Sequence, residues 1–245
     1  MDAQHVIADR YSLAEPLPGS VTGLSWHAVD QWSGQQVVIT RVPVSGLEDA
    51  ELVRVRQEIA REIRVLSGLR HDRLARPIGV VPGHGDLWVV SELAPDVTMA
   101  GELRRRGTLG PAEVARWGAD VADGLVAAHG AGVVHRNLSA GVVGIAADGR
   151  AVVSGFATTV LIPRNPRAGV PAHLAPEMAW GAPPSSASDI FALGAMLYSA
   201  VEGRDPFPAG DHVLAPPQRA GLLGDLLVPM MHPDPAQRPS AMGVA

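Results

Sequence analysis

The side chains that could carry out covalent or phosphate chemistry are restricted in type. All 20 Lys-plus-Arg residues of the chain are arginine, so lysine is absent, and cysteine is absent as well. Without lysine the chain cannot form a Schiff base or hold a phosphate with an ammonium group. Without cysteine it has no thiol nucleophile, disulfide or Cys-ligated zinc. Codon bias in a GC-rich genome explains the loss of lysine, but it leaves these chemical exclusions in force.

The composition indicates a globular domain. The chain has 245 residues, a hydrophobic content of 47% and a net charge of −5. This apolar content can form a core and argues against disorder, while the acidic balance argues against nucleic acid as a partner. No stretch approaches about 18 uncharged apolar residues, and the N-terminus lacks the features of a signal peptide. We therefore expect a cytoplasmic domain that makes no membrane contact through this segment.

The elements that must position any site change in character along the chain. The first part predicts strands at residues 10–17, 24–30, 36–42, 78–81 and 87–93. Between them, residues 48–69 predict a helix because their apolar residues recur at three- and four-residue spacing. The second part is mainly helical, with helices expected at 111–129, 188–201 and 221–231 and short strands at 142–145 and 151–153. A β-rich part followed by a helical part predicts an α+β fold with two lobes.

Six short motifs in order resemble the joints of a bacterial Ser/Thr protein kinase domain of the actinobacterial type. They are His135–Arg136–Asn137–Leu138, Gly155–Phe156–Ala157, Leu174–Ala175–Pro176–Glu177, residues 188–194, residues 203–207 and residues 234–239. One tripeptide alone would carry little weight, but six at the family's spacing argue against chance. The resemblance implies a kinase-like N-lobe at residues 1–94 and a C-lobe at 95–245, with the last helix truncated at Ala245.

The resemblance also shows what this chain has lost for gripping phosphate. Kinases use a glycine-rich loop and a third-strand lysine. Here residues 18–23 keep only the last of the loop's three glycines, so an ordinary hairpin turn is the simpler interpretation, and the lysine position holds Thr40. Its neighbour Arg41 should point to the opposite face of the strand, as a solvated surface charge. Glu62 occupies the position that normally pairs with the lysine, and a solvent-facing carboxylate is an equally good interpretation.

The positions of the base and the metal ligands depart further from the family. The catalytic aspartate is replaced by Asn137, whose amide can orient a hydroxyl but cannot accept a proton as a base. The lysine two residues later is replaced by Ser139. Val142 and Gly155 stand at the metal-binding positions, and neither offers the side-chain oxygen that hard cations need. We therefore expect no catalytic residue, no metal and no cofactor.

Residues that hold the fold together are kept. By resemblance, Glu177 pairs with Arg238 inside the helical lobe, and Asp189 caps the backbone of the catalytic loop. Removing one partner of a buried ion pair costs about 3–5 kcal/mol, so such residues can persist for stability alone. We assign structural roles to Glu62, Arg136, Phe156, Glu177, Asp189 and Arg238. Loss of chemistry with retention of scaffold predicts a pseudokinase, which binds proteins as a scaffold or regulator in Ser/Thr kinase signalling.

Two other functions stay open from the sequence. An adenine slot between the lobes would have Ser91 as gatekeeper, with backbone groups of Glu92, Leu93 and Ala94 as hinge contacts. The chain would then be an unorthodox ATP-binding Ser/Thr kinase or a metal-independent nucleotide-binding module. A purely structural spacer domain is the third interpretation.

The expected partners are proteins. An active kinase and a phosphothreonine-reading domain are the candidates that the resemblance implies, and Thr158 and Thr159 are the only hydroxyl residues at the start of the activation segment. Ordinary β-branched packing residues are the simpler interpretation of both threonines. In bacterial relatives a linker and a membrane helix often follow the domain, so a longer parent protein could be membrane-tethered beyond residue 245.

Overall fold

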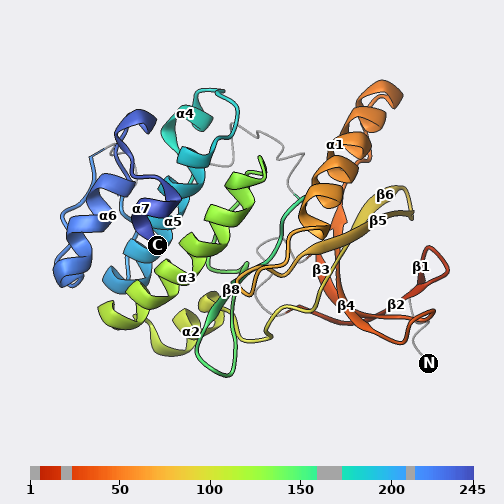
Figure 1. Ribbon diagram of the computed structural model, residues 1–245, viewed down its shortest axis with the longest axis horizontal. Coiled ribbons are helices and arrows are strands. Elements are labelled where there is room, and N and C mark those ends of the chain that lie inside the picture. The colour runs from red at the N-terminus through yellow and green to blue at the C-terminus, as the bar shows by residue number, and fades with distance from the viewer. Residues whose placement is uncertain (1–5, 18–23, 159–172, 208–212) are drawn as a thin grey trace.

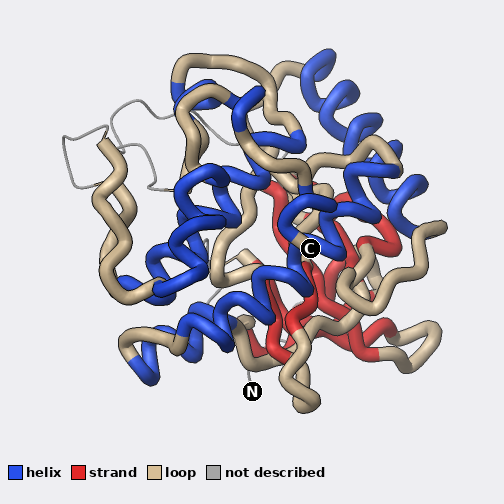
Figure 2. Tube along the Cα trace, turned by 60° about the vertical axis from the view of Figure 1, so that its left-hand side comes forward, coloured by secondary structure: helices blue, strands red, loops and turns tan. Residues whose placement is uncertain are grey.

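The structure is a computed structural model that describes residues 6–17, 24–158, 173–207 and 213–245. A curled β-sheet forms one lobe and a cluster of helices forms the other (Figure 1). The two-lobed α+β fold predicted from the sequence is thereby confirmed. Figure 2 brings the helices of the second lobe toward the viewer, with the strands of the first lobe behind them.

The N-lobe is a six-stranded sheet in which every strand is antiparallel to its neighbours, in the order β1-β2-β3-β4-β6-β5. The five strands predicted for this part of the chain are present in it, and β1 is a sixth, short strand that was not predicted. The strands are β1 (Val6–Ile7), β2 (Tyr11–Pro16), β3 (Ser25–Asp30), β4 (Gln36–Val42), β5 (Pro77–Gly83) and β6 (Asp86–Ser91).

One long helix, α1 (Asp49–Ser67), covers the sheet. Its predicted apolar stripe is the face that packs, because Val55, Ile59, Ile63 and Leu66 are all buried. Val55, Ile59 and Ile63 join Val42, Val44, Leu87 and Val89 in one core cluster. The opposite face of α1 is left to solvent, and its polar residues are free to interact elsewhere.

The C-lobe is built around a helix that is buried along almost its whole length, α5 (Ser186–Glu202). Ser185 and Ser188 form a reciprocal capping box at its start, and Gly203 ends it in the left-handed conformation, with φ 70°. These are the sequence signals of a well-defined helix start and stop. The other elements are α2 (Met99–Arg106), α3 (Pro111–Gly130), β7 (Val143–Ile145), β8 (Ala151–Val153), α4 (Pro176–Ala179), α6 (Gly224–Met230), α7 (Ala241–Val244) and the 3₁₀ turns Gly221–Leu223 and Pro235–Gln237. None of the helices within the described ranges is long and apolar enough to span a bilayer.

Helix α2 was not among the elements predicted from the sequence. Its apolar face is short, because only Met99 of its eight residues is buried and Leu103, one turn later, is partly buried against the core. Its start is nevertheless defined, because the side chain of Thr98 accepts a hydrogen bond from the backbone of Gly101 at 3.1 Å. A threonine cap followed by a largely polar turn is too weak a pattern to distinguish from a loop.

The two lobes are joined by backbone pairing as well as by the chain itself. The loop after α1 runs beside β8, where Ala75 donates to the carbonyl of Val153 at 2.8 Å and Val153 donates to the carbonyl of Arg73 at 2.8 Å. The guanidinium of Arg73 also lies 2.7 Å from a carboxylate oxygen of Asp120 on α3. This anchored loop sets where α1 stands relative to the C-lobe.

Candidate functional site

The carboxylate of Asp189 holds the start of the loop at residues 135–142 in place. Asp189, in the first turn of α5, accepts hydrogen bonds from the backbone N–H groups of His135 at 2.8 Å and Arg136 at 2.9 Å. His129 Nε2 lies 2.8 Å from the same carboxylate. Asp189 is only 1% exposed, and these partners compensate its buried charge. The contact implied by the resemblance, a carboxylate capping the loop, is therefore present.

His135 is occupied on both ring nitrogens. Nε2 donates to the carbonyl of Ser154 at 2.8 Å, and Nδ1 accepts from the backbone N–H of Asn137 at 3.3 Å. Burial lowers the pKa of His135, which favours this neutral form. The ring also packs edge-on against Phe156, with centroids 4.6 Å apart. His135 and Phe156 thus lock the loop to the segment after β8, and this imidazole is not available for proton transfer.

The polar side chains of this loop offer little chemistry. Asn137 is half-buried and supplies an amide where a base would need a carboxylate. Ser139 is 8% exposed, and its hydroxyl makes no hydrogen bond with any described residue. It brings no charge to the position where the resemblance implies a lysine.

Val142 and Gly155, which stand at the family's metal-binding positions, lie against each other. A Cβ atom added to Gly155 would stand 3.0 Å from Cγ1 of Val142, so the two residues are in direct contact. Neither provides an oxygen, and the described residues contain no cluster of three or more histidine or acidic side chains that could hold a metal ion. Mg²⁺ requires oxygen ligands, so these residues do not fit the ion.

The position of the family's third-strand lysine holds an uncharged residue, Thr40, whose hydroxyl already has a partner within the sheet. Thr40 pairs with Ser25 across β4 and β3, and their hydroxyl oxygens lie 2.9 Å apart. Arg41 is a surface charge, as the sequence predicts, with a side chain 41% exposed, but it also has a partner that the sequence did not reveal. Its Nε donates to Asp86 at 2.5 Å, and Asp86 is buried and also accepts from the backbone of Val44 at 3.0 Å. The partner was missed because β4 and β6 are neighbours in the sheet but not in the chain.

Glu62 is buried between the lobes, so the interpretation of a solvent-facing carboxylate is wrong. It is 1% exposed and accepts a hydrogen bond from Arg136 of the C-lobe loop. The same guanidinium nitrogen donates to Glu58, one turn earlier on α1, at 3.0 Å. Burial raises the pKa of Glu62, because Arg136 offsets only part of the lost hydration and Oε2 has no hydrogen-bond partner. These three residues form an ion cluster that ties α1 to the catalytic loop.

We predict that Arg136→Met is destabilising and that the loss depends on pH. The folded-state pKa of Glu62 lies above its unfolded value, so its ionised form weakens the fold as pH rises through that pKa. Removing Arg136 raises this pKa further. Thermal unfolding should therefore show a loss of about 3 kcal/mol at about pH 7.5 and a smaller loss at about pH 5.

The control for this prediction is the double variant Glu62→Gln with Arg136→Met. It lacks the titrating carboxylate, so its loss relative to Glu62→Gln should vary little between the two pH values. An equal loss at both pH values for Arg136→Met itself would show that the cluster does not govern the ionisation of Glu62.

The segment expected to form a nucleotide hinge lies where the sheet meets the helical lobe. Ser91 ends β6 and is buried, Ala94 is buried, and Leu93 is 45% exposed. The backbone N–H of Glu92 donates to the carbonyl of Arg76 at 2.9 Å, and its carboxylate binds the Arg76 side chain. The side chain and N–H of Glu92 are therefore committed to the protein, and only other backbone groups of the segment remain to meet a ligand.

The chain that follows this segment packs closely against strand β7. A Cβ atom on Gly144 of β7 would stand 2.8 Å from Cδ of Pro95. Glycine thus permits the chain after Ala94 to pack directly on β7.

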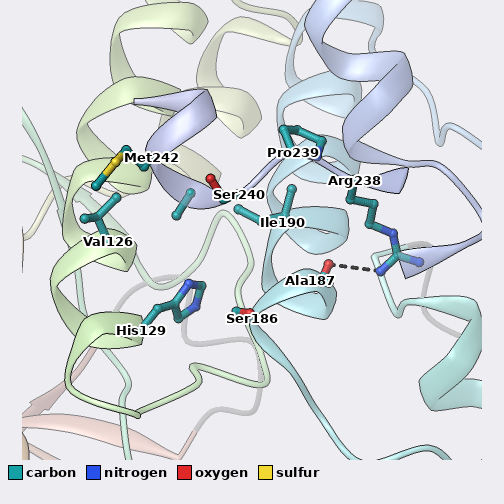
Figure 3. A pocket seen from close by; sticks show the side chains of 10 residues that line it. Val126, His129, Ser186, Ala187, Ile190, Arg238, Pro239, Ser240 and Met242 are labelled. Atoms are coloured by element: carbon teal, nitrogen blue, oxygen red, sulfur yellow. Dashed lines mark hydrogen bonds between the residues drawn. The ribbon is translucent and has the colours of Figure 1, made fainter. Parts of the chain in front are cut away.

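A bidentate ion pair fixes the far side of the helical lobe. Arg238 donates from Nη1 and Nη2 to the two oxygens of Glu177 at 2.7 and 2.8 Å. It also donates to the carbonyls of Ala187 at 2.9 Å and His232 at 2.8 Å, and its side chain is wholly buried. Figure 3 shows Arg238 beside a hollow of about 480 Å³ between α3, α5 and α7. The pair joins α4, α5 and the chain leading into α7.

The sequence of this chain matches a known family. The protein kinase domain matches residues 19–245. This chain belongs to the protein kinase domain family. It is 31% identical to "Serine/threonine-protein kinase PkaA" of Streptomyces coelicolor, over 98% of this chain and 49% of that protein. It is 33% identical to PkaB of the same organism and 28% identical to PknA of Mycobacterium tuberculosis, over 83% and 85% of this chain and about half of each relative. The kinase domain thus spans about half the length of these relatives.

Some expected features of the kinase domain lie outside the described residues. They are the phosphate-loop run at residues 18–23 and, in the activation segment, Thr159. Thr158 is described, and its hydroxyl donates to the carbonyl of Gly155 at 2.6 Å. Sequence reasoning missed Glu58 as a partner of Arg136, although its spacing of four residues from Glu62 places the two carboxylates on one side of α1.

Proposed function

We propose that this kinase domain is a pseudokinase, which acts by binding other proteins and transfers no phosphoryl group. The observation that carries the proposal is the apolar contact at the metal positions. Val142 and Gly155 approach each other with no oxygen between them. Phosphoryl transfer depends on metal ions that bridge the phosphates and neutralise developing charge. A site without ligands for such ions lacks the largest electrostatic contribution to the reaction.

The remaining charges support the same proposal. Thr40 places a hydroxyl, paired with Ser25, where a cation would contact the phosphates. The guanidinium of Arg136 is committed to Glu58 and Glu62 of α1. Asn137 cannot act as a base. Loss of a single preorganised stabilising group costs about 10²–10³ in rate, and several groups are missing together.

The contacts that hold the fold together are present although the catalytic groups are missing, which supports a role as a binding module. Asp189 holds the catalytic loop, and the Glu177–Arg238 pair holds the C-lobe helices, so the surfaces remain ordered without chemistry. Its partners in this proposal are proteins, among them an active kinase or a phosphothreonine-reading domain. Phosphorylation of Thr158 would break its hydroxyl contact with Gly155 and add about −1.5 to −2 charge, which such a domain could read.

Thermal unfolding with nucleotide and metal tests the proposal. A ligand at a hundred times its Kd stabilises the folded state by about 2.7 kcal/mol. We predict that about 1 mM ATP with Mg²⁺ gives no shift in Tm beyond that of ATP with a chelator. A reproducible upward shift of several degrees that requires the metal would contradict the proposal, because it would mean that other groups assemble a metal site.

A further inference from the structure

Most arginines of this chain are held by an acceptor within the described residues, but a few are not. Arg10, Arg41, Arg73, Arg76 and Arg238 each bind a carboxylate, for example. Six guanidinium groups have no hydrogen bond or ion pair with any described residue, those of Arg56, Arg61, Arg64, Arg70, Arg104 and Arg116. Three of these, Arg56, Arg61 and Arg64, lie on α1, and we call them the arginine face.

The arginine face is the solvent side of α1. Its three members are exposed, while the stripe formed by Val55, Ile59 and the following apolar positions is buried against the sheet. Arg61 and Arg64 are neighbours one turn apart. Figure 1 shows α1 rising from the strands of the N-lobe, with its far end beyond them. Val53, 54% exposed, adds an apolar spot on the same side of the helix.

Two of the four carboxylates of α1 are committed to the C-lobe, and the exposed Asp49 stands at the start of the helix. Glu58 and Glu62, which are close in sequence to all three arginines, bind Arg136 of the C-lobe instead. Glu51 reaches only Arg54, at 3.9 Å. The ion cluster between the lobes therefore commits Glu58 and Glu62 to Arg136, and neither forms an ion pair with the arginine face. The result is a concentrated positive patch on a chain whose net charge is −5.

We infer that the arginine face is a docking surface for an acidic protein segment. Charge complementarity commits the partner to clustered carboxylates or phosphates, which guanidinium groups bind in bidentate geometry. Val53 provides contact for one apolar side chain among them. An anionic membrane fits less well, because interfacial helices insert a broad apolar face and that face of α1 is buried in the sheet. The inference rests on the proposed function in one respect, that the domain acts through binding.

Fluorescence anisotropy with a labelled peptide of about twelve glutamates tests this inference. The parent protein should bind the peptide saturably at about 50 mM salt and more weakly at about 300 mM. The double variant Arg61→Gln with Arg64→Gln should lose at least about fivefold in affinity. The matched control is Arg104→Gln with Arg116→Gln, which makes the same change in net charge at exposed positions of the C-lobe and should lose less than about twofold.

Each other outcome overturns the inference. Equal losses in the two double variants would mean that net charge alone attracts the peptide. Tighter binding to phosphatidylserine vesicles, lost in Arg61→Gln with Arg64→Gln, would assign the face to a membrane surface. A dimer in sedimentation that the same variant dissociates would make a second copy the occupant. The peptide experiment uses no nucleotide, so its failure would contradict only the role of the arginine face. Phosphoryl transfer by the parent protein would instead contradict the proposed function, and it would not affect the inference about the arginine face.

Discussion

The variant Asn137→Asp is expected to transfer no more phosphate than the parent protein. The substitution supplies a carboxylate base, but Thr40, Val142 and Gly155 still leave the nucleotide without a cation or metal ligands. Because each missing stabilising group costs about 10²–10³ in rate, one restored group cannot bring the reaction above background. Radiolabel transfer from ATP to the protein and to a generic Ser/Thr substrate is the measurement.

The backbone conformation of Gly155 also disfavours putting a metal-binding side chain back at this position. Gly155 has φ +85°, a conformation that side chains rarely adopt, and its Cβ would crowd Val142 at 3.0 Å. Gly155→Asp should therefore lower the free energy of unfolding by about 1–3 kcal/mol while leaving transfer at background. Val142→Asn with Gly155→Asp is the companion variant, since it relieves the contact with valine. Transfer restored by Asn137→Asp alone would show that the other positions do not limit the reaction.

Arg238→Ala is expected to destabilise the C-lobe by about 3–5 kcal/mol. The substitution leaves the carboxylate of Glu177 without its bidentate partner and frees the carbonyls of Ala187 and His232. Glu177→Ala should have an effect of similar size, because it leaves a buried guanidinium uncompensated. Urea unfolding followed by circular dichroism measures both.

The matched control for this prediction is Arg105→Ala. Arg105 also makes two hydrogen bonds to one carboxylate, that of Glu102, but its side chain is 67% exposed. Exposed pairs contribute about 0–1 kcal/mol, so this variant should unfold almost like the parent. If Arg238→Ala also unfolds like the parent, burial of the Glu177 pair does not stabilise this lobe.

The sequence predicted those features that local pattern and ordered motifs determine. The apolar spacing of α1 and the apolar run at residues 188–201 of α5 are local signals, and both helices are present. The contacts of Asp189 and of Glu177 with Arg238 followed from residues that stand at fixed places in the family's motifs. A motif carries the spatial relation of distant residues, which composition and periodicity do not.

The contacts that sequence reasoning missed all join segments that are far apart in the chain and outside such motifs. Arg41 finds Asp86 because β4 and β6 are adjacent in the sheet, a pairing that no local pattern reveals. Glu62 finds Arg136 only once α1 is placed against the C-lobe loop, 74 residues later. Without a lysine at Thr40, the sequence gives no reason to choose this arginine over any other as the partner of Glu62.

The central claim is that this kinase domain catalyses no phosphoryl transfer, and a stoichiometric transfer assay tests it most directly. The protein, purified through successive columns, is incubated with labelled ATP and Mg²⁺ or Mn²⁺ beside the kinase domain of the Streptomyces coelicolor relative PkaA. We expect the incorporated label to stay at the level of a sample without protein. Incorporation well above that level, rising in step with the purified protein across fractions, would contradict it.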